Sequence, residues 1–254
     1  MTVRIPISRR YMWLGVLTVG VALFVLTRLA CQITGNPHLW PAYLFVGALI
    51  LPATVVSFTD GMSAEFDVQP VHLIVIATVG GVVGVVLAGL GEYGFQVVSG
   101  ELSRIAIAMI EEGCKLIVPF AALLLVRRNA ANGLIIGMAA GGGFAVIETL
   151  GYSAAAIVHA GSTLSDVDDI LWDRGLFAPA THIAWTGLAG CALGYAVQHR
   201  WSMAAIVVFL GAFASVVLIH SLWDSSNTGG YLVLSVMSLS AMWCVASVVA
   251  VRGA

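Results

Sequence analysis

The stretch RIAIAMIEEGCKLIVPFAALLLV, residues 104–126, is an apolar run long enough to cross a bilayer, and it carries Glu111, Glu112 and Lys115. An ionised side chain near the bilayer centre costs roughly 2.5–3.5 kcal/mol, so these groups need partners inside the protein. On a helix, Lys115 follows Glu112 by three residues and Glu111 by four, and one ammonium can serve one carboxylate while the other stays free. The free carboxylate is a candidate catalytic group. The alternative is a buried salt bridge that only fixes helix packing.

The composition of the whole chain is that of an integral membrane protein. Of its 254 residues, 60% are hydrophobic and 9% are charged, and the mean hydropathy is +1.00. A net charge of −2 without a basic tail predicts no nucleic-acid partner. We predict an all-α fold, a polytopic membrane helical bundle that forms a single domain over residues 1–254. Its eight transmembrane helices are expected at residues 11–33, 41–58, 71–93, 104–126, 133–158, 179–197, 203–223 and 231–251.

Basic residues in the short loops predict the orientation of these spans. With eight crossings, one side of the membrane carries Arg4, Arg9, Arg10, Arg127, Arg128, Arg200 and Arg252. The other side carries only Arg104 and Arg174, with Arg28 near the membrane edge. Short cytoplasmic loops are enriched in such residues, so both termini of this multi-pass plasma-membrane protein are predicted to be cytoplasmic. Residues 159–177, which include four aspartates, are predicted to be a solvated loop on the other side.

Three further spans carry titratable side chains at the depth of the two glutamates. Glu148 lies past the middle of the fifth span, His182 about one turn into the sixth, and His220 near the outer end of the seventh. At 1.5 Å per residue, all these groups share the outer half of the membrane to within roughly 10 Å. Each has an ordinary alternative: Glu148 as a protonated packing residue, His182 bonded to a carbonyl, and His220 paired with Asp224 at the helix end.

Glycines provide a way to bring these spans together. Gly137 with Gly141, and Gly190 with Gly194, form small-xxx-small faces on the fifth and sixth spans. Such faces allow helix backbones to approach closely in lipid. We expect them to hold the polar helices around a wet pocket.

The balance of charge limits the chemistry of that pocket. If all ionise, Glu111, Glu112 and Glu148 exceed Lys115 by about two negative charges, which a low-dielectric site does not tolerate. One solution is a divalent cation, with zinc held by His182, His220, Glu148 and a water that Glu111 or Glu112 deprotonates. The other solution is a metal-free site with one or two protonated carboxyls, in which a glutamate activates water.

Four short motifs stand in order within a core of about residues 104–224: Glu111-Glu112-x-x-Lys115, Phe144-Ala145-x-x-Glu148, His182, and His220-x-x-Trp223-Asp224. Together they resemble the PrsW-type intramembrane proteases, relatives of the CAAX prenyl endopeptidase superfamily. The resemblance implies hydrolysis of a peptide bond in a membrane-anchored protein or peptide, such as an anti-sigma factor. It leaves open whether the enzyme is a metalloprotease or a glutamate protease.

The same resemblance implies roles for individual residues. Glu148 takes the place where CAAX-type enzymes have a histidine beside the reacting water. His220 and Asp224 take the places of a histidine and an asparagine that stabilise the oxyanion, and an aspartate has to be protonated to donate that hydrogen bond. The predicted catalytic residues are Glu111, Glu112, Lys115, Glu148, His182, His220 and Asp224, and the predicted metal ligands are Glu148, His182 and His220.

A proton-coupled or cation-coupled transporter is the alternative from another functional class, because buried Glu, Lys and His side chains also serve as proton relays. The sequence contains no repeat-related halves and no pair of interrupted helices at matching positions, which counts against it. A third interpretation is an inactive scaffold that binds membrane helices through its glycine-rich faces.

Overall fold

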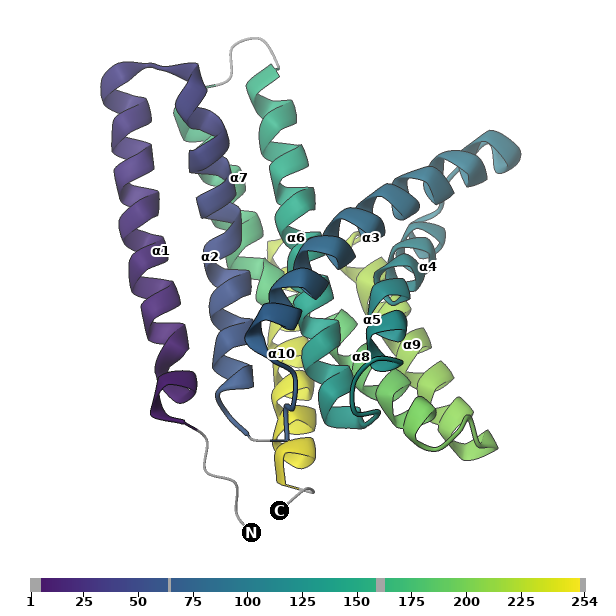
Figure 1. Cartoon of the computed structure of the whole chain (residues 1–254). Helices are drawn as coiled ribbons and strands as arrows, with labels where there is room; N and C mark the ends of the chain where they lie inside the picture. The colour runs from purple at the N-terminus through teal and green to yellow at the C-terminus, as the bar shows by residue number, and fades with distance from the viewer. Residues whose placement is uncertain (1–5, 64, 159–162, 252–254) are drawn as a thin grey trace.

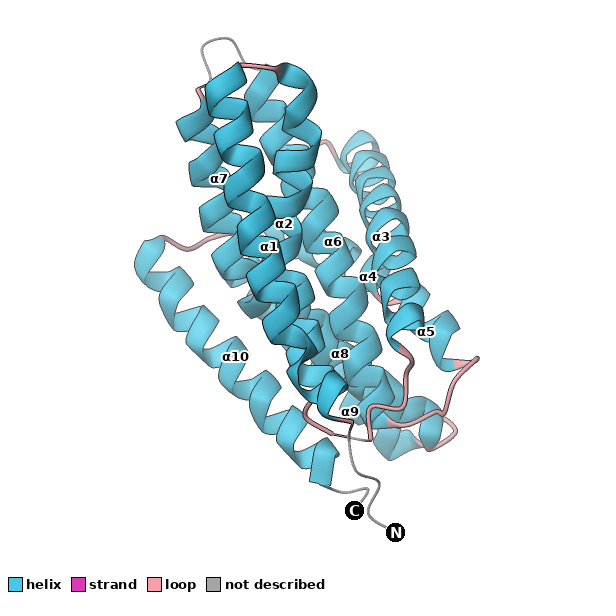
Figure 2. Cartoon of the chain, turned by 60° about the vertical axis from the view of Figure 1, so that its left-hand side comes forward, coloured by secondary structure: helices cyan, strands magenta, loops and turns pink. Residues whose placement is uncertain are grey.

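The computed structural model describes residues 6–63, 65–158 and 163–251, which form helices and loops with no strand among them (Figure 2). The α-helices are α1 (Ile7–Thr34), α2 (Trp40–Asp60), α3 (Pro70–Ser99), α4 (Arg104–Lys115), α5 (Ile117–Leu123), α6 (Ala130–Val158), α7 (Leu164–Phe177), α8 (His182–Gln198), α9 (Met203–Trp223) and α10 (Thr228–Val251). Within the described residues, seven stretches are long and apolar enough to cross a membrane, and one of them is α7 and α8 together. The predicted all-α polytopic bundle is confirmed.

The beginning of α1 and the end of α10 lie at the same end of the bundle (Figure 1). Arg9 in the first turns of α1 pairs with Asp60, the last residue of α2, at 2.6 Å. Beyond α2, the Ser63 hydroxyl donates a hydrogen bond of 3.1 Å to the carbonyl oxygen of Ala250 near the end of α10. These contacts fix the three helix ends relative to one another.

The predicted span at residues 104–126 is two short helices, α4 and α5, which meet at Leu116. Pro119 explains the break, because its ring has no N–H and clashes with the carbonyl of the residue four positions earlier, Lys115. The amide of Leu116 bonds to Gly113 in a tighter turn instead. Lys115 is therefore the last residue of α4, where its positive charge interacts favourably with the carbonyl end of the helix.

The prediction of a solvated loop at residues 159–177 is wrong for the part that the structure describes, since residues 164–177 form helix α7; residues 159–162 lie outside the described residues. A capping box between Thr163 and Asp166 begins the helix. Val167 and Leu171, one turn apart, are buried in an apolar cluster with Tyr43 of α2. The four aspartates led to the prediction of a loop, although Val167 and Leu171 have the spacing of an apolar helix face.

Helices α6 and α8 form the centre of the bundle through the predicted glycine faces. A Cβ added at Gly137 would lie 2.2 Å from the carbonyl oxygen of Thr186, and one added at Gly141 would lie 2.2 Å from that of His182. Only glycine permits this approach of the two backbones. A similar contact between Gly81 and Gly143 joins α3 to α6, beyond which α3 diverges from α6 in Figure 1.

Candidate active site

The structure brings all the predicted site residues into one connected cluster, contributed by α4, α6, α8 and α9, together with Asp224 at the end of α9. Helix α4 contributes Lys115, whose ammonium is completely shielded from solvent by protein. Its Nζ lies 2.9 Å from Glu111 Oε2 and 2.7 Å from Glu112 Oε1. The expectation that the lysine leaves one glutamate free is therefore wrong, because both glutamates lie on the same helix face within reach of the long side chain.

A third acceptor for Lys115 determines the tautomer of His182. Lys115 Nζ lies 2.9 Å from His182 Nδ1, and an ammonium has only hydrogens to offer, so Nδ1 accepts. The remaining ring nitrogen, Nε2, then carries the proton of the neutral imidazole and lies 2.9 Å from Glu148 Oε2. His182 thus connects the lysine of α4 to the glutamate of α6.

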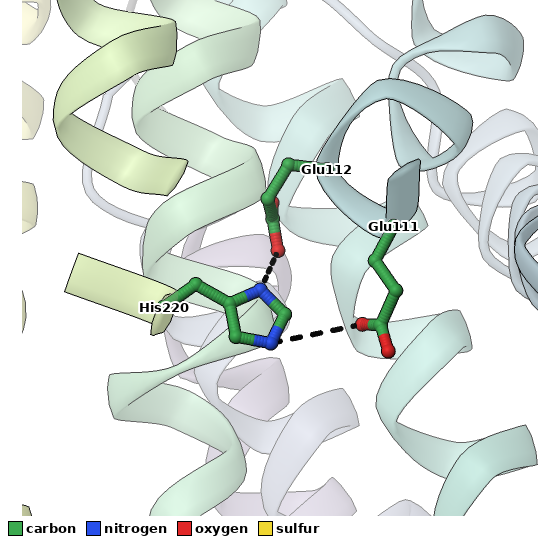
Figure 3. A group of neighbouring side chains, drawn as sticks. All are labelled: Glu111, Glu112 and His220. Atoms are coloured by element: carbon green, nitrogen blue, oxygen red, sulfur yellow. Dashed lines mark hydrogen bonds and ion pairs between the residues drawn. The ribbon is translucent and has the colours of Figure 1, made fainter. Parts of the chain in front are cut away.

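Glu112 orients the second histidine (Figure 3). Glu112 is fully buried, and its Oε1 lies 2.9 Å from His220 Nδ1, which donates to the ionised carboxylate. The ring of Trp185 stacks on His220 with 4.9 Å between centroids. His220 Nε2 consequently faces Glu111 Oε2 at 3.9 Å and Asp224 Oδ2 at 3.6 Å.

These residues surround a cavity of about 480 Å³. Its wall includes Glu111, Glu148, His182, His220 and Asp224, whereas Glu112 and Lys115 lie behind that wall. Burial, opposed by the charge of His220, raises the pKa of the Asp224 carboxyl above its usual value. Of the two adjacent glutamates, Glu111 is therefore the one that faces the cavity.

Arg174 of α7 also belongs to the site, although the sequence interpretation placed it in a loop. Its guanidinium lies 2.6 Å from Glu148 Oε2, and its Nε donates to Thr149 Oγ1 at 3.3 Å. It also covers the ring of Tyr152 at 4.1 Å. Arg174 neutralises one carboxylate, so the negative excess of the cluster is smaller than the sequence alone indicated. The helical spacing of Val167 and Leu171 was the signal that could have placed it.

Among the described residues, three side chains have ligand atoms close enough to share a metal ion: Glu111, Glu112 and His220, within 4.8 Å of one another. Glu112 Oε2 is buried and has no hydrogen-bond partner among the described residues, which fits a cation bound there. Two carboxylates and an imidazole are suitable donors for zinc. The predicted set differs, because both nitrogens of His182 already contact Lys115 and Glu148, and its ring centre lies 6.1 Å from that of His220.

A family model described as PrsW family intramembrane metalloprotease matches residues 69–251. The match includes every residue of the cluster and begins one residue before α3. No curated protein and no solved structure matches the chain significantly.

Proposed function

Because the chain belongs to the PrsW family of intramembrane metalloproteases, and is therefore a membrane-embedded protease, we propose that it cleaves a membrane-anchored protein in the cavity bordered by Glu111. The observation that carries this proposal is that the two adjacent glutamates have different environments. Glu111 faces the cavity, while Glu112 is buried against His220. A carboxylate beside a bound water, with a histidine held next to it, is the arrangement needed to hydrolyse a peptide bond.

Glu111 is the proposed proton acceptor. Lys115 holds its Oε2, and its side chain is 12% exposed, so a water in the cavity can reach the carboxylate. Glu148 is less suited to this step, because Arg174 and His182 already occupy its Oε2. We assign Glu148 and His182 to orienting the water. Proton transfer by such a positioned group contributes typically about 10²–10⁴-fold to a rate.

His220 and Asp224 are proposed to face the carbonyl oxygen of the substrate. Glu112 holds the His220 Nδ1 proton, so the Nε2 atom is the one directed towards the cavity and Asp224. The raised pKa of Asp224 favours the protonated carboxyl, which can donate a hydrogen bond to the developing oxyanion.

The family implies a metal, and we propose zinc, held by Glu111, Glu112 and His220. His220 Nε2 would then be a ligand, and Asp224 alone would face the carbonyl oxygen of the substrate. When bound, zinc would lower the pKa of water and polarise the peptide carbonyl. Each carboxylate uses one oxygen for Lys115 and keeps a second. Glu111 could therefore serve as a ligand or as the proton acceptor, and the metal content of a Glu111 variant distinguishes these roles.

The substrate is proposed to be a membrane-anchored regulator such as an anti-sigma factor. We also propose a plasma-membrane location with both termini in the cytoplasm, supported by the loop arginines and by the ends of α1 and α10 lying together. The transporter alternative is not favoured, because the matching family consists of proteases.

The test is cleavage of a panel of single-span membrane peptides by the detergent-purified protein, with and without a chelator. Glu111→Gln and His220→Ala should each reduce cleavage at least about 100-fold. Glu101→Gln, an exposed glutamate in the α3–α4 loop, is the matched control and should cleave normally. If the Glu111→Gln protein retains its metal, Glu111 is the proton acceptor. If the variant loses its metal, Glu111 is a ligand. Normal cleavage by both site variants would contradict the proposed function.

A further inference from the structure

Helix α7 makes polar contacts in two directions. Near its C-terminal end, Arg174 reaches Glu148 in the cavity. Six residues earlier, Asp168 reaches Arg28 of α1 and Tyr43 of α2. The helix therefore connects the site to the N-terminal hairpin α1–α2, which lies outside the matched residues 69–251.

The contacts of Arg174 determine where the Glu148 carboxylate can lie. Glu148 Oε2 is shared between Arg174 at 2.6 Å and His182 at 2.9 Å. The guanidinium is itself held from two further sides, by Thr149 Oγ1 and by the ring of Tyr152. A carboxylate that loses a close cationic partner in a largely buried site moves or becomes protonated. Either change would also leave the His182 Nε2–H without the carboxylate that faces it.

The Asp168 carboxylate connects α7 to the hairpin, and both of its oxygens accept hydrogen bonds there. We call this group of contacts the joint. Arg28 donates to Oδ2 from Nε at 2.9 Å and from its terminal nitrogen at 2.5 Å, and Tyr43 donates its hydroxyl to Oδ1. Asp168 is buried, and its neighbours Val167 and Leu171 pack beside Tyr43. Helix α7 cannot slide or rotate on the hairpin without separating this charge from its partners.

We propose that Arg174 is a positioning residue that holds Glu148 and His182 in their productive arrangement, and that the α1–α2 hairpin keeps Arg174 in place through Asp168. The proposal rests on the proposed function of this site. It gives the two helices outside the matched region a role in catalysis although neither reaches the cavity wall.

The first experiment measures cleavage by Arg174→Ala and Arg174→Lys beside wild type and Glu111→Gln. A misplacement of about 1 Å, caused by a mutation away from the reacting atoms, can lower a rate by up to about 100-fold. We expect Arg174→Ala to lower kcat by that factor with little change in KM, Arg174→Lys to recover part of it, and added guanidinium to restore cleavage more than sodium at equal ionic strength. A raised KM with unchanged kcat would mean that Arg174 binds substrate, and would overturn the proposal.

The second experiment tests the hairpin with Asp168→Asn and the gentler Tyr43→Phe. Each should lower kcat on its own, but neither should lower it further in the Arg174→Ala background, because the same positioning is already lost. Reductions that multiply would show that the joint acts independently of Arg174 and would overturn this part. Asp169→Asn, the exposed neighbouring carboxylate on α7, is the matched control and should match wild type.

A third measurement does not depend on cleavage and separates failure of this proposal from failure of the proposed function. Nitrogen NMR of histidine-labelled protein, assigned with His182→Gln, reports which ring nitrogen of His182 carries the proton. Wild type should show the Nε2 proton, and Arg174→Ala should change that signal. An unchanged His182 signal would contradict the positioning role whether or not a substrate is found.

Discussion

The α6–α8 pair and the α1–α2 hairpin are built in opposite ways. In the most apolar 18-residue stretch of α6, 83% of the residues are buried, whereas in that of α1 only 6% are. Helices α6 and α8 touch backbone to backbone at glycines, whereas α1 and α2 reach α7 through side chains, by apolar packing around Tyr43 and by the ion pair of Arg28 with Asp168. Close contact between backbones positions Glu148 and His182 directly. The polar contacts of the hairpin with the site run through α7, although α2 also packs against α6 where Pro52 approaches Gly142.

The largest effect is expected where the backbones touch. Gly141→Ala would place a Cβ 2.2 Å from the carbonyl oxygen of His182, so α8 must move away. We expect the variant to lose about 1–3 kcal/mol of stability and most of its cleavage activity, because His182 begins α8. Thermal unfolding in detergent and the peptide assay measure both. Gly151→Ala on the same helix meets nothing within 4 Å and serves as the control. Equal unfolding temperatures for Gly141→Ala and Gly151→Ala would contradict the importance of the backbone contact between α6 and α8.

A second prediction separates the two histidines, one on the tightly packed α8 and one on α9. His220→Ala removes a member of the group whose ligand atoms lie within 4.8 Å, so it should reduce metal affinity by more than about tenfold. His182→Ala should retain the metal, because both His182 nitrogens contact other side chains. Elemental analysis of the purified proteins measures the difference. Metal loss in both variants would favour the ligand set predicted from the sequence, which contains His182 as well as His220.

The smallest effect on catalysis is expected at the end of the hairpin that lies away from Asp168. Arg9→Ala breaks the pair with buried Asp60 and should cost about 1–3 kcal/mol of stability, since that carboxylate is left without its partner. Below the unfolding temperature, kcat should equal that of wild type. Arg10→Ala removes a neighbouring exposed charge and should change neither quantity. A fall in kcat for Arg9→Ala would show that the whole hairpin, rather than its joint with α7, supports the site.

Much of the fold was predictable because lipid imposes a simple rule on sequence. Backbone groups in a bilayer must bond within their own helix, so long apolar runs identify the spans. Pro119 was visible in the sequence, but the resulting break into α4 and α5 was not predicted. Helix α7 was missed because its four aspartates outweighed the apolar face of Val167 and Leu171. One of those aspartates, Asp168, is buried against Arg28.

The sequence by itself determined that this is a polytopic helical membrane protein and which acids and imidazoles share one depth, because hydrophobic length and helical rise depend only on residue order. Tertiary structure alone decided which partner each group has. Lys115 contacts both glutamates and His182, Glu112 turns away from the cavity, and Arg174 joins Glu148 from another helix. Such pairings depend on the rotation and separation of neighbouring helices, which glycine contacts such as that at Gly141 fix only when the helices pack.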